Sequence, residues 1–356
     1  MTRRKRAAKL GTVITKAQLL GAAEVSARGN AAHPFTQAAI AAIGADLAAG
    51  AAAWWPAAEA AWQARHFADA DQALHLVWSA MHYEALSGHP LGKQLLTCGG
   101  EPSGALGQAV REFLAAPPAG FQVSLASRWP RVFSPFWAKQ WLDPARLFFQ
   151  RRKLPYTVVE LNSPGGLGTC IDLLTLGHKG FDSALVEARL GLDQRPLDLR
   201  KDDDAKWLIA CCLPDESPSV RASAAGARKL RGLLAEDEAL VQLADCAPAL
   251  APAFIAKNLP PDPEAGLLVF STSFLRDLGR QESMAAAQAL GRALGAWDDR
   301  ALWVAVEPRV DPSWIDVVVK RRQGDLFVPH LFRSVRFAPV KSSLEHAENN
   351  AKFLAA

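Results

Sequence analysis

Residues 156–168 read Tyr-Thr-Val-Val-Glu-Leu-Asn-Ser-Pro-Gly-Gly-Leu-Gly. The first part, Tyr156–Leu161, is a short run rich in β-branched residues, which is typical of a buried strand. A glycine loop, Glu160–Gly168, follows at once, and an apolar, helix-like stretch continues to Leu176. Glycines let such a loop turn sharply, approach a ligand closely and point amide groups at it. The stretch therefore predicts the first strand, loop and helix of an α/β domain.

The rest of the C-terminal half repeats this alternation of short apolar runs and helical segments. The apolar runs lie at Ala184–Leu192, Gly266–Ser271 and Ala301–Glu307. Buried strands that alternate with helices predict a parallel sheet covered on both faces. Two further strand-like runs flank a Gly-containing turn at Gln323-Gly324-Asp325, as in a hairpin. These runs are Ser313–Lys320 and Leu326–Phe332. We expect a Rossmann-like α/β sheet that ends in an antiparallel hairpin.

The N-terminal half reads as helix after helix. Ala and Leu dominate it, and apolar residues return every three or four positions, for example over Ala70–Leu86. It is also rich in tryptophan, which we expect to fill the contact between these helices and the other domain, with a binding cleft as the alternative. The predicted organisation is a basic, flexible tail over 1–20, a helical domain covering the site over 21–150, a Rossmann-like domain over 151–340, and a tail or helix over 341–356.

The composition is that of a globular protein with a hydrophobic core, because 50% of the residues are hydrophobic and 21% are charged. No stretch is long and apolar enough to span a bilayer, and the basic start lacks the apolar core of a secretory signal. Five cysteines, an odd number without zinc-type spacing, predict reduced thiols in a cytoplasmic protein and no metal site. The net charge of +4 is modest, so nucleic acid is not an expected partner. The substrate, small molecule or protein, and the oligomeric state stay open.

Two acids and the glycine loop form the predicted cofactor site. Glu160 ends the first strand, where its carboxylate can hydrogen-bond a ligand, and Asp193 falls 25 residues after Gly168, at the end of the next strand. In dinucleotide-binding folds an acid at that place accepts hydrogen bonds from ribose hydroxyls. The alternatives are a structural strand-to-helix turn and, for Asp193, a turn residue before Pro196. The predicted cofactor-binding residues are Glu160, Asn162, Ser163, Gly165, Gly166, Gly168, Asp193 and Ser271.

The expected hairpin favours one class of ligand. NAD-binding sheets usually continue with parallel strands, whereas a hairpin after the fifth strand resembles the class I S-adenosylmethionine-dependent methyltransferases. That resemblance implies that the glycine loop wraps the methionine part of S-adenosylmethionine, that Asp193 holds its ribose, and that residues after the fourth strand face the substrate. On the substrate side we expect Thr272, Ser273, Arg128, Arg131 and Glu307. The two arginines precede the sheet, where they either bind a ligand carboxylate or phosphate or form interdomain salt bridges.

Several short motifs, taken in their order and spacing, are similar to those of one protein family. They are His33-Pro34-Phe35, Gly88-His89-Pro90-Leu91, Gln122–Arg128, Leu154–Leu161, Arg189–Asp193 with Pro196-Leu197-Asp198, Trp207-Leu208 with Pro214, and Leu302–Pro308. Nearly the whole chain thus resembles the domain-of-unknown-function 2332 family, bacterial proteins with a helical N-terminal part and a methyltransferase-like C-terminal part. The loop of that family usually reads Glu-x-Gly-x-Ser-Ala-Gly-Leu-Asn. Here Asn162, Pro164 and Gly168 replace its first Gly, its Ser and its Asn. Asn tolerates positive φ, so Asn162 is compatible with the turn, whereas Pro164 removes an amide donor.

The leading hypothesis is an S-adenosylmethionine-dependent, methyltransferase-like protein of unknown substrate. Positioning would contribute most to an in-line methyl transfer, and no catalytic residue is assigned. The altered loop motivates a hypothesis from another class, a non-catalytic interaction protein on a degenerate methyltransferase fold. A third hypothesis is a Rossmann-like enzyme that uses another nucleotide.

Overall fold

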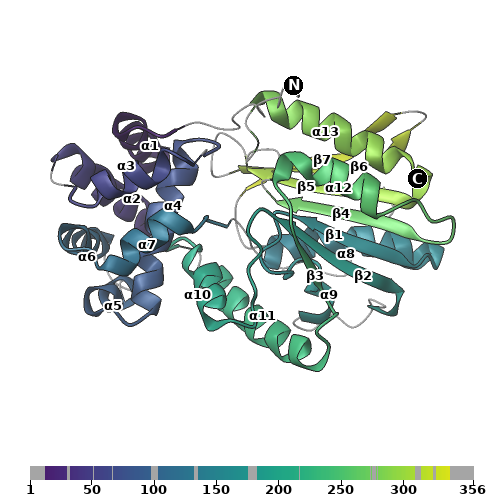
Figure 1. Cartoon of the computed structure of the whole chain (residues 1–356), viewed down its shortest axis with the longest axis horizontal. Helices are drawn as coiled ribbons and strands as arrows, with labels where there is room; N and C mark the ends of the chain where they lie inside the picture. The colour runs from purple at the N-terminus through teal and green to yellow at the C-terminus, as the bar shows by residue number, and fades with distance from the viewer. Residues whose placement is uncertain are drawn as a thin grey trace, which may run out of the picture. The chain divides into compact units, whose positions relative to one another are not determined.

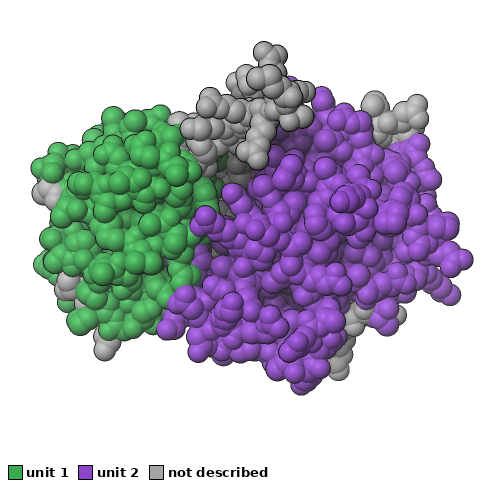
Figure 2. Space-filling view, viewed as in Figure 1, with its two compact units in different colours: residues 1–130, 277–281 green, residues 131–276, 282–356 purple. Residues whose placement is uncertain are grey.

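The computed structural model describes residues 13–29, 33–50, 52–65, 67–97, 103–131, 135–174, 183–215, 217–272, 274, 278, 280–308, 314–323 and 326–336. The chain divides into two compact units (Figure 2), Met1–Pro130 with Asp277–Gln281 and Arg131–Arg276 with Glu282–Ala356. The division falls after Pro130 and not near residue 150. The helix that precedes the sheet therefore belongs to the same unit as the sheet.

The first unit is helical in the part that the structure describes. Its helices are α1 (Lys16–Gly29), α2 (Pro34–Ala48), α3 (Trp55–Trp62), α4 (Ala70–Leu86), α5 (Pro90–Thr97), α6 (Ser103–Ala115) and α7 (Ala119–Ser127). Residues 16–20 form the start of α1 and not the end of a flexible tail, and residues 1–12 lie outside the described residues. α4 begins where the Asp69 side chain accepts a hydrogen bond from the Gln72 amide at 2.8 Å, which satisfies one free donor of the first turn.

Aromatic side chains fill the centre of this unit. Trp54, Trp62 and Phe67 are fully buried, and the rings of Trp62 and Phe67 meet edge to face with centroids 5.0 Å apart. The Trp62 Nε1 donates to the Leu125 carbonyl at 2.8 Å, so its polar atom is satisfied. These tryptophans pack helices together within the unit.

The second unit is built on one sheet (Figure 1). Its described strands lie in the order β3-β2-β1-β4-β5-β6-β7. They are β1 (Tyr156–Leu161), β2 (Val186–Asp193), β3 (Gln242–Asp245), β4 (Gly266–Thr272), β5 (Ala301–Pro308), β6 (Trp314–Gln323) and β7 (Leu326–Arg336). β1 to β5 are parallel, β6 pairs antiparallel with β5, and β7 pairs antiparallel with β6. Two of the expected turn residues, Gly324 and Asp325, lie outside the described residues.

Most of these strands match their predicted bounds closely. β1 begins and ends at the predicted residues, and β4 and β5 each end one residue later than predicted. β3 was not predicted, because Gln-Leu-Ala-Asp contains no apolar run and the strand is at an edge of the sheet, where both its end residues are exposed.

Helices precede, connect and alternate with the parallel strands of this sheet in the sequence. They are α8 (Pro135–Arg152), α9 (Ile171–Leu174), α10 (Asp202–Ala210), α11 (Ser217–Glu236), α12 (Ala251–Asn258) and α13 (Arg280–Gly295). α8, α9 and α11 contact one another, and α8 also contacts β4 and β5, so these helices form one layer against the sheet. In the part of the chain that the structure describes, no helix has the length and apolarity needed to cross a membrane.

Candidate functional site

Two acids mark the carboxyl ends of β1 and β2. Glu160 lies opposite Gly191 of β2, and Asp193, the last residue of β2, lies opposite Asp245 at the end of β3. Because side chains alternate between the faces of a sheet, Glu160, Gly191 and Asp193 share one face. The sheet therefore brings both predicted acids to one side of its carboxyl edge, which is where open parallel sheets bind ligands.

The loop after β1 turns through left-handed backbone conformations. Asn162, Gly165 and Gly166 have φ values of 57°, 72° and 85°, a region that asparagine and glycine adopt at low cost. A Cβ on Gly165 would lie 2.5 Å from Leu199 Cγ, and one on Gly166 would lie 2.8 Å from Val241 Cγ1. Both the turn and the packing thus require glycine, and Asn162 takes the positive φ that the sequence allowed for it.

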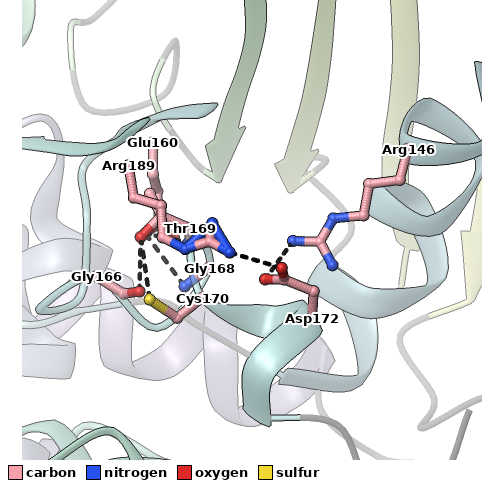
Figure 3. Close-up of polar contacts among 8 residues, drawn as sticks. All are labelled: Arg146, Glu160, Gly166, Gly168, Thr169, Cys170, Asp172 and Arg189. Carbon is pink, nitrogen blue, oxygen red and sulfur yellow. Dashed lines mark hydrogen bonds and ion pairs between the residues drawn. The ribbon is translucent and has the colours of Figure 1, made fainter. Parts of the chain in front are cut away.

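The Glu160 carboxylate folds back beneath this loop (Figure 3). Its Oε2 accepts hydrogen bonds from the Gly168 amide at 3.2 Å and the Thr169 amide at 3.3 Å. The same oxygen accepts a hydrogen bond from Ser163 Oγ at 2.8 Å. The residue is only 1% exposed. The sequence led us to expect this carboxylate against a ligand, whereas the structure places it against the loop. The carboxylate fits there because Gly168 has no side chain: a Cβ on this residue would overlap Glu160 Oε1.

The same carboxyl group has a strongly shifted pKa. Burial raises the pKa of Glu160 from the ordinary value of 4.5 to about 7. The hydrogen bonds from Ser163, Thr169 and Gly168 lower this pKa, and the nearby Asp193 carboxylate raises it further. The acid at the end of β1 therefore titrates close to neutral pH.

The loop amides are engaged within the protein. Those of Gly168 and Thr169 donate to Glu160, and that of Gly166 donates to Ser163 Oγ at 3.0 Å. The Thr169 hydroxyl donates to the Gly166 carbonyl at 2.8 Å. Successive backbone amides of a turn can form a concave site for an anion. In this loop the anion is the protein's own carboxylate.

Asp193 is bonded differently. Its Oδ1 accepts hydrogen bonds from Arg131 Nη2 at 2.7 Å and from the Arg195 amide at 2.9 Å. Its Oδ2 is buried and has no hydrogen-bond partner among the described residues. Burial raises the pKa of Asp193, the Arg131 guanidinium and the Arg195 amide lower it, and Asp245 raises it. Oδ1 of this carboxylate therefore accepts two hydrogen bonds, whereas Oδ2 is an acceptor without a donor among the described residues.

The remaining predicted residues near the sheet are less informative. Ser271 is fully buried, and its Oγ accepts a hydrogen bond from Trp303 Nε1 at 3.1 Å, so it contacts a neighbouring strand. Strand β4 ends at Thr272, and the Glu307 backbone lies in β5. Ser273 lies outside the described residues.

The two predicted arginines separate. Arg131 donates to both Asp193 Oδ1 and, at 3.0 Å, the Arg195 carbonyl. Arg128 is the residue after the last turn of α7, and its guanidinium lies 4.6 Å from the centre of the Tyr83 ring. The structure therefore joins Arg131 to the predicted ribose acid, and the contact between Arg128 and Tyr83 lies within the helical unit.

A buried ion-pair cluster was missed by the sequence analysis. Asp172 of α9 binds Arg146 Nη2 of α8 at 2.9 Å through Oδ1 and Arg189 Nη2 of β2 at 2.7 Å through Oδ2 (Figure 3). The three side chains are 3–6% exposed. The cluster ties the segment after the glycine loop to β2 and α8. A charged Arg189 inside an apolar strand was the available signal, but its partner could not be read from spacing.

Metal-binding groups do not gather in the described part of the chain. Nowhere in it do three His, Cys, Asp or Glu side chains converge as metal ligands. The described cysteines are buried, namely Cys170, Cys211, Cys212 and Cys246.

Comparison with known proteins identifies a family and no closer relative. Residues 151–333 match the family described as "Uncharacterized protein conserved in bacteria (DUF2332)", a segment that spans more than half of the chain and runs from the end of α8 into β7. No curated protein matches the chain, and no solved structure matches it. The matched segment contains the glycine loop, both strand-end acids and two residues of the buried cluster, Asp172 and Arg189, whereas Arg146 lies before it. The chain belongs to the DUF2332 family.

Proposed function

We propose that the protein binds an adenosine-containing cofactor at the carboxyl edge of its parallel strands, and that this cofactor is S-adenosylmethionine. Three features support the proposal: the strand order β3-β2-β1-β4-β5, the glycine loop after β1, and the acid that ends β2. Open α/β sheets bind nucleotides where the strand order reverses, which here is between β1 and β4. On this proposal the protein is methyltransferase-like and its substrate is unidentified.

The observation that carries the proposal is the unused oxygen of Asp193. A buried carboxylate oxygen without a donor costs free energy, because it has lost water and gained nothing in exchange. Asp193 Oδ2 is in this condition among the described residues, at the end of β2. A ribose hydroxyl would supply the missing donor. The acid is already oriented for that role, because Arg131 and the Arg195 amide hold its other oxygen.

The preference for S-adenosylmethionine over NAD rests on the strands that follow β5. An antiparallel strand at that place is the feature that resembles class I methyltransferases. When bound, S-adenosylmethionine would supply an electrophilic methyl group, and Asp193 would orient the adenosyl part by its ribose. Positioning of this kind is a large part of catalysis in bimolecular transfers. No side chain is assigned as a catalytic base.

Isothermal titration calorimetry on the full chain tests the proposal. S-adenosylmethionine and its demethylated product, S-adenosylhomocysteine, should each bind at a single site, and adenosine should bind more weakly than either. Free methionine serves as the control for the part of the ligand that does not reach Asp193. If neither S-adenosylmethionine nor S-adenosylhomocysteine binds at millimolar concentration, the proposal is wrong.

The second candidate is a non-catalytic interaction protein on a degenerate methyltransferase fold. The packing of the loop favours it, since Leu199 and Val241 occupy the space beside Gly165 and Gly166. In that case the glycines serve internal packing only. S-adenosylhomocysteine would then change neither the thermal unfolding midpoint nor the hydrogen exchange of the loop amides, and a decrease in their exchange rate would exclude this candidate.

A further inference from the structure

The hydrogen bonds of the glycine loop define an anion site that is already filled. The Gly168 amide, the Thr169 amide and the Ser163 hydroxyl all point at one oxygen, Glu160 Oε2. Loops that bind phosphate present the same kinds of donor to an external oxyanion. Here the oxyanion is attached to the strand that leads into the loop.

The carboxylate leaves no room for a second anion at this position. Glu160 is 1% exposed, and its Oε1 occupies the place where a Cβ on Gly168 would lie. Ser163 is also fully buried, and its Oγ already accepts a hydrogen bond from the Gly166 amide. An external phosphate would have to displace Glu160 before it reached these donors.

We infer that Glu160 is the built-in anion of the glycine loop, and that it makes the site selective for ligands that bring no phosphate to this loop. The preference for S-adenosylmethionine within this inference rests on the proposed function, while the built-in anion stands on the loop geometry alone. Nucleoside diphosphates and dinucleotides are disfavoured, because their phosphates would meet a carboxylate of like charge in place of free amides. S-adenosylmethionine has no phosphate, so it avoids this repulsion.

The first arm of the test removes the built-in anion and offers a substitute. Glu160→Ala empties the donor set, and acetate is a small carboxylate that can refill it. The thermal unfolding midpoint is measured in sodium acetate and in sodium chloride of equal ionic strength, at a pH about one unit above the Glu160 pKa, which is about 7. The variant should lose about 5 °C or more in chloride and regain roughly half of that loss in acetate, saturably.

Two controls make this arm specific. The wild type and Glu187→Ala should have the same midpoint in both salts, because Glu187 is an exposed carboxylate of β2. If Glu160→Ala is unfolded in chloride, it is refolded in each salt, and recovery of folded protein in acetate alone supports the inference. Equal behaviour of Glu160→Ala in acetate and chloride overturns it.

The second arm measures selectivity with a variant that keeps the shape of the side chain. At the same pH, about one unit above the Glu160 pKa, Glu160→Gln removes the charge. Adenosine diphosphate should then bind the variant at least about tenfold more tightly than the wild type, with a smaller change for S-adenosylhomocysteine. An unchanged affinity for adenosine diphosphate contradicts the selectivity. If the wild type binds neither S-adenosylmethionine nor S-adenosylhomocysteine, the proposed function fails. The acetate arm still decides whether Glu160 is the built-in anion.

Discussion

Glu160 and Asp193 are both buried carboxylates on one face of neighbouring strands, yet the protein uses them in opposite ways. Three donors meet Glu160 Oε2 from within the glycine loop. Asp193 has two donors on Oδ1 and none on Oδ2 among the described residues. The difference teaches that an acid at a strand end is not by itself a ligand contact. The satisfied acid stabilises the loop, and the half-satisfied acid is the one with binding capacity left.

The largest expected effect separates the two acids by their contribution to stability. Glu160→Ala leaves two amides and a hydroxyl buried without an acceptor, so it should lower the free energy of unfolding by about 4 kcal/mol. Asp193→Ala should cost about 2 kcal/mol, because only Oδ1 has donors to lose. Denaturant titrations of both variants at one pH compare the two losses. Equal losses would remove the distinction between the two acids.

The pH dependence of stability sharpens the same comparison. The pKa of Glu160 is raised from 4.5 to about 7 in the folded protein, so the folded state holds more protons than the unfolded state between these values. Its contribution to stability is therefore complete below pH 4.5 and is lost as pH rises to about 7. The total loss is about 3 kcal/mol.

Glu160→Gln isolates this effect from the other titrating groups, Asp193 among them. The difference in unfolding free energy between wild type and variant should shrink or reverse over that pH interval and stay constant at higher pH. Denaturant titrations at a series of pH values measure it. A pH-independent difference would show that the pKa of Glu160 is not raised.

A smaller effect probes the space that Glu160 occupies. Gly168→Ala places a Cβ where Glu160 Oε1 lies, so the carboxylate must move away from its donors, and the change should cost about 2 kcal/mol. Gly232→Ala is the matched control, because Gly232 is an exposed residue of α11 with open space around its Cβ position. That control should stabilise the protein by about 0.5 kcal/mol. If Gly168→Ala has the same free energy of unfolding as the wild type, Glu160 is not confined as described.

The sequence predicted the frame of the site better than its contacts. β1 was found at its observed bounds because its β-branched run has the length and composition of a buried strand, and Asp193 was correctly placed at the end of the next strand. The direction of the Glu160 side chain was not predictable, because it depends on how the loop folds back eight residues later. The pairing of Asp172 with Arg146 and Arg189 was missed for the same reason, since its partners come from separate elements.

The boundary between the two halves shows a related limit. α8 was assigned to the helical domain because its sequence is helical, but in the structure it lies in one layer with α9 and α11 beside the sheet. Helical periodicity reveals the element and not the surface on which it packs. Arg131 was a candidate on the substrate side, and its contact with Asp193 became visible only in three dimensions.

The most direct test of the central claim compares S-adenosylhomocysteine binding to Asp193→Asn and to Asp245→Asn by calorimetry. Asp245 is the acid opposite Asp193 at the end of β3, and it is exposed. If Asp193 Oδ2 accepts a ribose hydroxyl, Asp193→Asn should weaken binding by about tenfold or more, whereas Asp245→Asn should leave it within about twofold of the wild type. Equal affinity of the wild type and Asp193→Asn would contradict the claim that this oxygen binds the cofactor.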